Sequence, residues 1–352
     1  VLGEVRYRAG YQTFAATGGG QVDAPLGFDR GFEIYRVDDW IHQPGRIVEW
    51  VRARSERPYF LFLHCYETHE PYTHTRFAEG MPSGRLTGEF SKEIWNRLRK
   101  RFSDEEMRYA QALYDGDIAY TDAKLGQFFA EYERTGLLAD SIVIVTSDHG
   151  EQFWENGSWG HGQNLHDHQI HVPLLVFLPD AVRKDLERTS RERRKGPPLT
   201  QGAIEDQVEL IDLYPTLLEL LGVDLEGPVN GRSLVSLLAG QGSLAAREAF
   251  AEHTNVKEHE QKALRTPRFK FIVSIPRKSS SATGESYEIY DLKRDPAEQN
   301  NLAPGLPDRV SELRKRIGKI MDGTDLALEE EVPADIDEDL RNQLKALGYI
   351  GN

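Results

Sequence analysis

Three short apolar runs, at residues 57–65, 141–146 and 171–178, constrain the fold of this chain more than any other feature. Their continuous apolar character is typical of strands that are buried on both faces, as in a parallel sheet. Between the first two runs, the segment from Ser103 to about Tyr132 has a capping serine and an acidic first turn, which predict a long helix. Alternating helices and strands indicate an α/β fold. We therefore expect a large, mostly parallel sheet flanked by helices.

The composition changes after an amphipathic helix that is expected at 208–221 and ends at Gly222, which predicts a second and smaller unit. Residues 269–274 and 287–292 alternate apolar and polar side chains with a period of two, the pattern of an antiparallel hairpin. A last helix is expected from Leu302 to Met321. We predict three parts: an α/β catalytic domain at 1–245, a small antiparallel α+β unit at 246–321, and an acidic C-terminal tail at 322–352.

The net charge narrows the range of partners. The chain has 57 acidic and 43 basic residues and a formal net charge of -14, which argues against general nucleic-acid binding. An anionic substrate would then be captured by a local positive site such as a metal ion. No apolar run approaches the ~20 residues of a membrane-spanning helix. The single cysteine, Cys65, excludes an internal disulfide and a cysteine-based zinc site.

Asp148 and His149 directly follow the strand predicted at 141–146. They are therefore expected at the edge of the sheet where open α/β folds have their active sites. A carboxylate and an imidazole that are adjacent in a loop can both turn onto one cation. Gly150 lets the backbone bend immediately afterwards. The alternative is a helix cap followed by an exposed histidine, and the tripeptide alone does not separate the two.

Histidines are concentrated after this loop, and their number favours the metal site. Five of the eleven histidines lie within residues 149–171. His161 is flanked by two glycines, which expose its imidazole. His69 lies in a second loop after a predicted strand, so we expect both side chains at one edge of the sheet. For His166 and His168 we expect solvent-exposed surface positions rather than metal ligands.

Short motifs that occur in order along most of the chain carry a family resemblance. They are Tyr59–Tyr72 (YFLFLHCYETHEPY), Tyr114–Asp122 (YDGDIAYTD), Ile142–Glu151 (IVIVTSDHGE), Gly160–Val176 (GHGQNLHDHQIHVPLLV), Ile211–Gly222 (IDLYPTLLELLG), Gly231–Leu234 (GRSL) and Tyr290–Leu302 (YDLKRDPAEQNNL). The terminal Leu347–Ile350 also fits. As a set, these motifs resemble those of the sulfatase family within the alkaline-phosphatase-like superfamily.

The resemblance implies roles for four residues. The position of Asp148 is a metal ligand in the family, and the next residue, here His149, is often a second ligand. His69 stands at a position that contacts the sulfate oxygens. His161 falls where many members carry a lysine that contacts the ester oxygens. The implied cofactor is one divalent metal ion, with calcium as the first choice. Because an imidazole is a softer ligand than calcium usually takes, magnesium, manganese and zinc remain open.

The resemblance also implies the reaction, which is hydrolysis of a sulfate ester such as a sulfated sugar by an exported or extracellular enzyme. The metal would offset the charge of the ester oxygens and activate the nucleophile. His69 and His161 would hold the anion, and His161 could protonate the leaving alcohol.

The nucleophile itself is not found in these residues. In the family it lies in a Cys/Ser-x-Pro-x-Arg motif, whose first residue is oxidised to formylglycine, after an N-terminal strand that bears metal-binding aspartates. Neither occurs here, and the chain starts at Val1. We therefore expect that the chain begins after this segment and is inactive alone. Two alternatives stay open: a phosphodiesterase, phosphonate-ester hydrolase or phosphoglycerol transferase of the same superfamily, or a catalytically inactive homologue.

Overall fold

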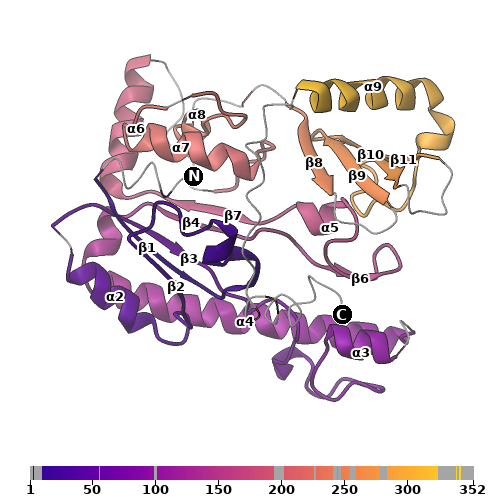
Figure 1. The fold of residues 1–352 in the computed structure, drawn as a ribbon, viewed down its shortest axis with the longest axis horizontal. Helices are drawn as coiled ribbons and strands as arrows, with labels where there is room; N and C mark the ends of the chain where they lie inside the picture. The colour runs from indigo at the N-terminus through magenta and orange to yellow at the C-terminus, as the bar shows by residue number, and fades with distance from the viewer. Residues whose placement is uncertain are drawn as a thin grey trace. The chain divides into compact units, whose positions relative to one another are not determined.

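The computed structural model describes most of the chain as two compact units (Figure 1). The described residues are 10–54, 56–98, 101–193, 202–225, 227–240, 247–253, 259–277 and 284–323, with Gly3, Leu244, Glu338 and Arg341. One unit draws on residues 1–141 and 331–352, and the other on residues 142–330. The division expected near residue 245 stays a prediction. Most of the tail expected at 322–352 lies outside the described residues.

A three-stranded parallel sheet forms the centre of the first unit. Its strands, in spatial order, are β2 (Ile34–Val37), β1 (Gln12–Thr17) and β3 (Tyr59–Leu63). Phe14 lies opposite Ile34 on one side and opposite Leu61 on the other. β3 confirms the strand predicted from the first apolar run.

The central strand β1 is fully buried, although its sequence, QTFAAT, shows no apolar run. Its polar side chains are accommodated by hydrogen bonds to backbone carbonyls. Gln12 Nε2 donates to Arg54 O at 3.0 Å, and Thr13 Oγ1 donates to Gly31 O at 2.9 Å. Because these bonds form only in the folded unit, hydrophobic patterning does not reveal the strand.

The helices described in this unit include α2 (Pro44–Arg52), α3 (Lys92–Arg97) and α4 (Asp104–Glu133), with short 3-10 turns at Gly20–Val22, Ala24–Leu26, Thr75–Phe77 and Leu137–Asp140. Two of these helices, α2 and α4, pack against the sheet. Phe14 of β1 shares a core with Val51 of α2 and Phe128 of α4. α4 confirms the predicted long helix. It begins with a capping box between Ser103 and Glu106, and such a cap stabilises a helix by about 1 kcal/mol.

The second unit begins with the two other predicted strands. β4 (Val143–Thr146) and β7 (Leu174–Phe177) pair antiparallel, with Val143 opposite Phe177. The elements between and after them are β5 (Gln152–Phe153), β6 (Trp159–Gly160), α5 (Asp167–Ile170), α6 (Asp180–Arg193), a 3-10 turn (Leu210–Asp212), α7 (Leu213–Leu220) and α8 (Val235–Leu238). β5 and β6 form a short hairpin. None of the described helices has the length and apolar character that crossing a membrane requires.

A four-stranded antiparallel sheet follows in the same unit, and we call it the C-terminal sheet. Its strands are β8 (Ala249–His253), β9 (His259–Arg265), β10 (Phe269–Pro276) and β11 (Ser286–Asp291), in the order β11-β10-β9-β8. The β10–β11 pair confirms the predicted hairpin. The last helix, α9 (Pro307–Gly323), starts later than expected, after a 3-10 turn at Ala303–Gly305.

Both faces of the C-terminal sheet are covered. On one face, Phe271 and Ile289 pack with Ile317 of α9, which runs along the sheet in Figure 1. On the other face, Ile272 packs with Leu165, which lies just before α5. The loops that follow β4 are therefore in contact with the C-terminal sheet, and this contact places the candidate site.

Candidate active site

Asp148 and His149 lie in the loop directly after β4, as the sequence predicts. Asp148 Oδ2 and His149 Nε2 are 3.8 Å apart, and Asp148 Oδ1 accepts a hydrogen bond from the His149 backbone N–H at 3.0 Å. The two side chains are 72% and 33% exposed, so both are open to solvent. They converge on one side of the loop rather than pointing to opposite faces.

The hydrogen bond that Nδ1 of His149 makes determines which of its two ring nitrogens can bind a cation. His149 Nδ1 lies 2.8 Å from the carbonyl oxygen of Gly150, which can only accept, so Nδ1 carries a proton. In the neutral ring Nε2 then holds a lone pair, and it is Nε2 that faces Asp148. One divalent cation can bridge such a pair, because its bonds to carboxylate and imidazole ligands are about 2.0–2.6 Å long. The donor set present in the loop therefore fits a metal ion.

His161 joins this pair from the loop after β6. Its ring stacks on that of His149, with centroids 4.1 Å apart and planes inclined by 25°. His161 Nδ1 lies 3.2 Å and 3.3 Å from the two carboxylate oxygens of Glu151. A carboxylate behind an imidazole fixes its tautomer and its orientation, which leaves Nε2 as the atom that could act on a substrate.

Glu151 is a site residue that sequence reasoning did not single out. Its side chain is only 6% exposed, which is unusual for a glutamate, and His161 is its partner. The signal was present in the sequence, because Glu151 closes the Asp-His-Gly-Glu motif. Its role could not be inferred from the sequence, because only the folded chain places His161 next to Glu151.

Gly150 permits the close packing of this loop. Its backbone N–H donates to Gln169 O at 2.9 Å. A Cβ at this position would lie 2.2 Å from His168 O, far inside contact distance. The loop of Asp148 and His149 therefore rests directly on the backbone of α5.

His69 belongs to the first unit, in the loop after β3. His69 Nδ1–H donates to Glu70 O at 2.8 Å, and the ring meets Tyr66 edge-on with centroids 5.5 Å apart. The imidazole is half-buried. That His69 shares a pocket with Asp148 stays a prediction.

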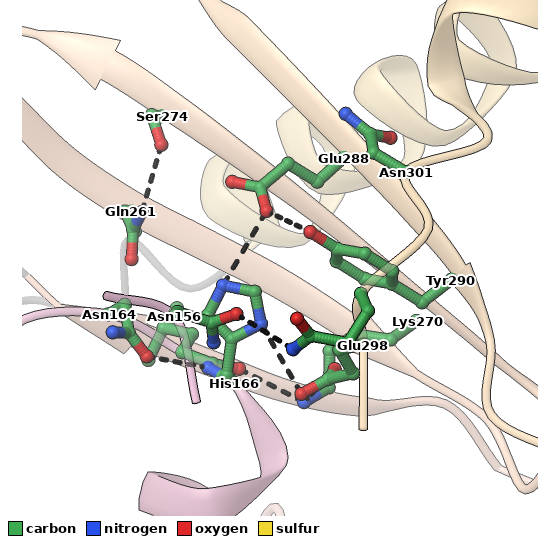
Figure 2. Close-up of polar contacts among 12 residues, drawn as sticks. Asn156, Asn164, His166, Gln261, Lys270, Ser274, Glu288, Tyr290, Glu298 and Asn301 are labelled. Atoms are coloured by element: carbon green, nitrogen blue, oxygen red, sulfur yellow. Dashed lines mark hydrogen bonds and ion pairs between the residues drawn. The ribbon is translucent and has the colours of Figure 1, made fainter. Parts of the chain in front are cut away.

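The expected surface positions of His166 and His168 are wrong. The His166 side chain is only 8% exposed and lies between two carboxylates, 3.5 Å from Glu288 and 3.3 Å from Glu298 (Figure 2). His168 Nε2–H donates to Gln152 Oε1 at 2.7 Å, and burial lowers the pKa of His168. His166 is buried and His168 is half-buried because the loop after β6 is covered by the C-terminal sheet, a contact that local sequence does not show.

The first unit contains another group with metal-type donors. Ligand atoms of Asp39, His42 and Glu67 all lie within 4.8 Å of one another. His42 Nδ1 is 2.5 Å from Asp39 Oδ1 and 3.9 Å from Glu67 Oε1, and Tyr120 OH lies 2.7 Å from His42 Nε2. Sequence reasoning missed this group, because Glu67 is distant in the chain from the other two residues. Asp39 and His42 are exposed, so the group differs in burial from the pair of His161 and Glu151.

Comparisons with known proteins identify the family to which this chain is similar. The sulfatase family model matches residues 45–223, and the model of the C-terminal region of N-sulphoglucosamine sulphohydrolase matches residues 196–322. Arylsulfatase K of Xenopus laevis is 28% identical over 226 residues, which are 63% of this chain and 39% of that protein. An arylsulfatase of Clostridium perfringens is 24% identical over 321 residues, or 86% of this chain and 60% of that protein. The match with each of these relatives thus spans less than two thirds of the relative's length.

Solved structures with the same fold include enzymes of two kinds. A protein in complex with its substrate D-glucosamine-2-N,6-O-disulfate superposes with a TM-score of 0.62 at 15% identity, over 92% of this chain and 83% of that one. The phosphonate monoester hydrolase of Agrobacterium radiobacter superposes with a TM-score of 0.64 at 17% identity, over 92% and 80% of the two chains. At these identities the similarity establishes a common fold.

Proposed function

The chain belongs to the sulfatase family, and we propose that it forms the metal-binding and anion-binding part of a sulfuric ester hydrolase. The observation that carries this proposal is the convergence of Asp148, His149 and His161 in loops of one unit. Asp148 and His149 offer facing ligand atoms 3.8 Å apart, and the ring of His161 stacks directly on His149. A cation and an imidazole side by side are suited to an ester whose reacting group is anionic.

Asp148 and His149 would hold one divalent metal ion, which when bound offsets the charge on the ester oxygens. Calcium is the first choice through the family. Magnesium, manganese or zinc would suit His149 Nε2 at least as well, since imidazole is a softer ligand. Gly150 O fixes the tautomer that this role needs, because it accepts the hydrogen bond from His149 Nδ1.

His161 would bind the anion and supply a proton. Because its Nδ1 is oriented by Glu151, proton transfer to the leaving alcohol would occur from Nε2. The family resemblance assigns His69 to the sulfate oxygens, and this role is part of the proposal. Hydrogen bonds of this type strengthen as charge develops in the transition state, which is how they accelerate the reaction.

A sulfated sugar is the substrate class that we propose, since one structure of the same fold holds a disulfated glucosamine. An exported or extracellular location, expected from the family, is part of the same proposal. The second candidate is hydrolysis of a phosphonate monoester. It is favoured by the imidazole of His161 at a position where many sulfatases carry a lysine, and by the phosphonate hydrolases that share the fold.

Two measurements test the proposal. Calorimetric titration of the 352-residue chain with Ca²⁺ and with Mn²⁺ should give one site, and Asp148→Asn should abolish or strongly weaken it. Turnover is measured on the protein as its gene encodes it in full, with matched aryl esters of sulfate and of methylphosphonate. Preference for the sulfate ester supports the first candidate, and preference for the phosphonate supports the second. A protein with no site for either ion and no turnover of either ester would be an inactive homologue.

A further inference from the structure

A fully buried lysine, Lys270 of β10, lies between carboxylates from two distant parts of the second unit. Its side chain is 0% exposed, and its Nζ contacts Asp167 and lies 2.8 Å from Glu298 Oε1. It also donates to the carbonyl oxygen of Leu165 at 3.1 Å. Figure 2 shows Lys270 and Glu298 together beside His166. Because a buried charge is costly unless it is paired, these contacts tie the three segments to one another.

Asp167, the first residue of α5, is the centre of this cluster. Arg265 of β9 donates to its carboxylate at 3.0 Å and 2.7 Å, and the Asp167 backbone N–H donates to Glu298 Oε2 at 2.6 Å. Burial alone would raise the pKa of Asp167, but Arg265 and Lys270 outweigh burial and hold that pKa well below its usual range. The positive charges of Arg265 and Lys270 balance the negative charges of Asp167 and Glu298.

The backbone conformation of Glu298 is further evidence that the contacts within this cluster are specific. Glu298 has a φ of 55°, in the left-handed region that non-glycine residues seldom adopt. Its side chain is only 1% exposed. Such a conformation persists where the surrounding contacts hold it in place. Here it directs the carboxylate towards Lys270 and the first turn of α5.

The turn that Asp167 begins is the one on which the loop of Asp148 and His149 rests. The Gly150 N–H donates to Gln169 O at 2.9 Å. Gln152, whose side chain is buried, accepts from His168 Nε2 at 2.7 Å and from Gln169 Nε2 at 3.2 Å. A continuous path of contacts thus leads from the C-terminal sheet through α5 to Gly150 and Gln152, which follow Asp148 and His149 in the chain.

We propose that Lys270, Asp167 and Glu298 are positioning residues for the metal site. They anchor α5 to the C-terminal sheet, and α5 in turn fixes the backbone that presents Asp148 and His149. None of the three touches Asp148 or His149, so their effect passes through the contacts of α5 with Gly150 and Gln152. The inference rests on the proposed function for its metal, although the anchoring of the loop can be measured without one.

The test compares Lys270→Met and the charge-balanced double variant Lys270→Met/Glu298→Gln with the unaltered 352-residue chain. The double variant keeps the Asp167–Arg265 pair and leaves no buried charge without a partner, so it guards against failure of the single variant to fold. Affinity for Mn²⁺ is measured by calorimetry, and exchange of the Gly150 amide proton is measured by NMR. We expect Mn²⁺ to bind about 10- to 100-fold more weakly, as for other residues that support metal ligands, and Gly150 to exchange faster.

The matched control is Arg268→Met, which removes an ion pair with Asp291 on the same sheet. Arg268 is 51% exposed, and its pair lies outside the path to the loop. Affinity and Gly150 exchange should be unchanged in this variant. Unchanged affinity and exchange in the folded double variant would overturn the proposal. If the unaltered chain binds no Mn²⁺, the proposed function fails, whereas the exchange of Gly150 still decides whether the cluster anchors the loop.

Discussion

The imidazole rings of His149 and His161 stack with their centroids 4.1 Å apart. In the proposed site one ring would offer a nitrogen to a cation and the other is held by a carboxylate, so two different chemical roles would share one aromatic contact. A substitution of either ring removes packing from the other. Variants at these two positions are therefore best compared by separate measurements of metal binding and of turnover.

His149→Ala should weaken metal binding by more than the 10- to 100-fold that is typical for residues behind a ligand, because Nε2 is expected to bind the metal directly. Mn²⁺ titration of the 352-residue chain measures the effect. His171→Ala is the matched control, since His171 is an exposed histidine just before β7. Equal affinity of the His149 variant and the unaltered chain would remove His149 from the site.

His161→Ala should lower kcat by ~10²–10³ in the enzyme that its gene encodes in full, the usual effect of losing a group that stabilises transition-state charge. If His161 also protonates the leaving group, the loss should be larger for esters of poorly acidic alcohols than for aryl esters. A loss that is equal on both ester types would leave His161 as an anion binder only. Unchanged kcat on both would exclude it from the site.

The purified 352-residue chain should bind the metal but not turn over an aryl sulfate. The reason is that its sequence contains no Cys/Ser-x-Pro-x-Arg motif from which the family's nucleophile is made. Assays with a chromogenic sulfate ester at saturating Ca²⁺ or Mn²⁺ check this. Measurable turnover would show that another residue of the chain acts as the nucleophile.

Gly150→Ala should destabilise the second unit and weaken metal binding. Its Cβ would lie 2.2 Å from His168 O, so either the loop or α5 must move. Steric strain of this kind costs about 1–3 kcal/mol. Gly126→Ala in α4 is the control, because a Cβ there has no neighbour within 4 Å and alanine favours a helix by up to about 1 kcal/mol. Urea unfolding and Mn²⁺ titration should separate the two variants, and equal behaviour would contradict the packing argument.

Acid should destabilise the first unit through Glu106. Arg85 donates to both of its carboxylate oxygens at 2.7 Å and lowers the pKa of Glu106 from 4.5 to about 2. Because the pKa of Glu106 is lower in the folded than in the unfolded state, its ionised carboxylate stabilises the fold at pH values above about 4.5. This contribution to stability is lost as pH falls from about 4.5 to about 2. The difference in unfolding free energy between the unaltered chain and Glu106→Gln should therefore shrink over that range. The exposed neighbour Glu105 gives the control Glu105→Gln, which should keep the pH dependence of the unaltered chain.

Elements with strong local patterns could be predicted from the sequence. β3, β4 and β7 are apolar runs, α4 has its capping box at Ser103, and the hairpin of β10 and β11 alternates with a period of two. β1 could not be recognised, because Gln12 and Thr13 become compatible with burial only through tertiary hydrogen bonds.

The residues of the candidate site also fall into two groups, those that local sequence indicates and those that it does not. Asp148, His149 and His161 stand out because their neighbours in the sequence are glycines and a strand. Glu151 was overlooked because its partner, His161, comes next to it only in the folded chain. His166 was expected at the surface, but it contacts Glu288, which comes much later in the sequence. Local sequence indicates candidate residues for the chemistry, whereas the groups that orient these residues become visible only in the folded chain.

Asp167 and Glu298 contact each other although they are 131 positions apart in the chain. A ribosome that adds about 5–20 residues per second needs roughly 7–26 s to make the intervening segment. Throughout that interval α5, on which the loop of Asp148 and His149 rests, lacks its contacts with Lys270, Glu298 or both. The proposed metal site should thus mature late in synthesis, only after the chain has been made as far as Glu298.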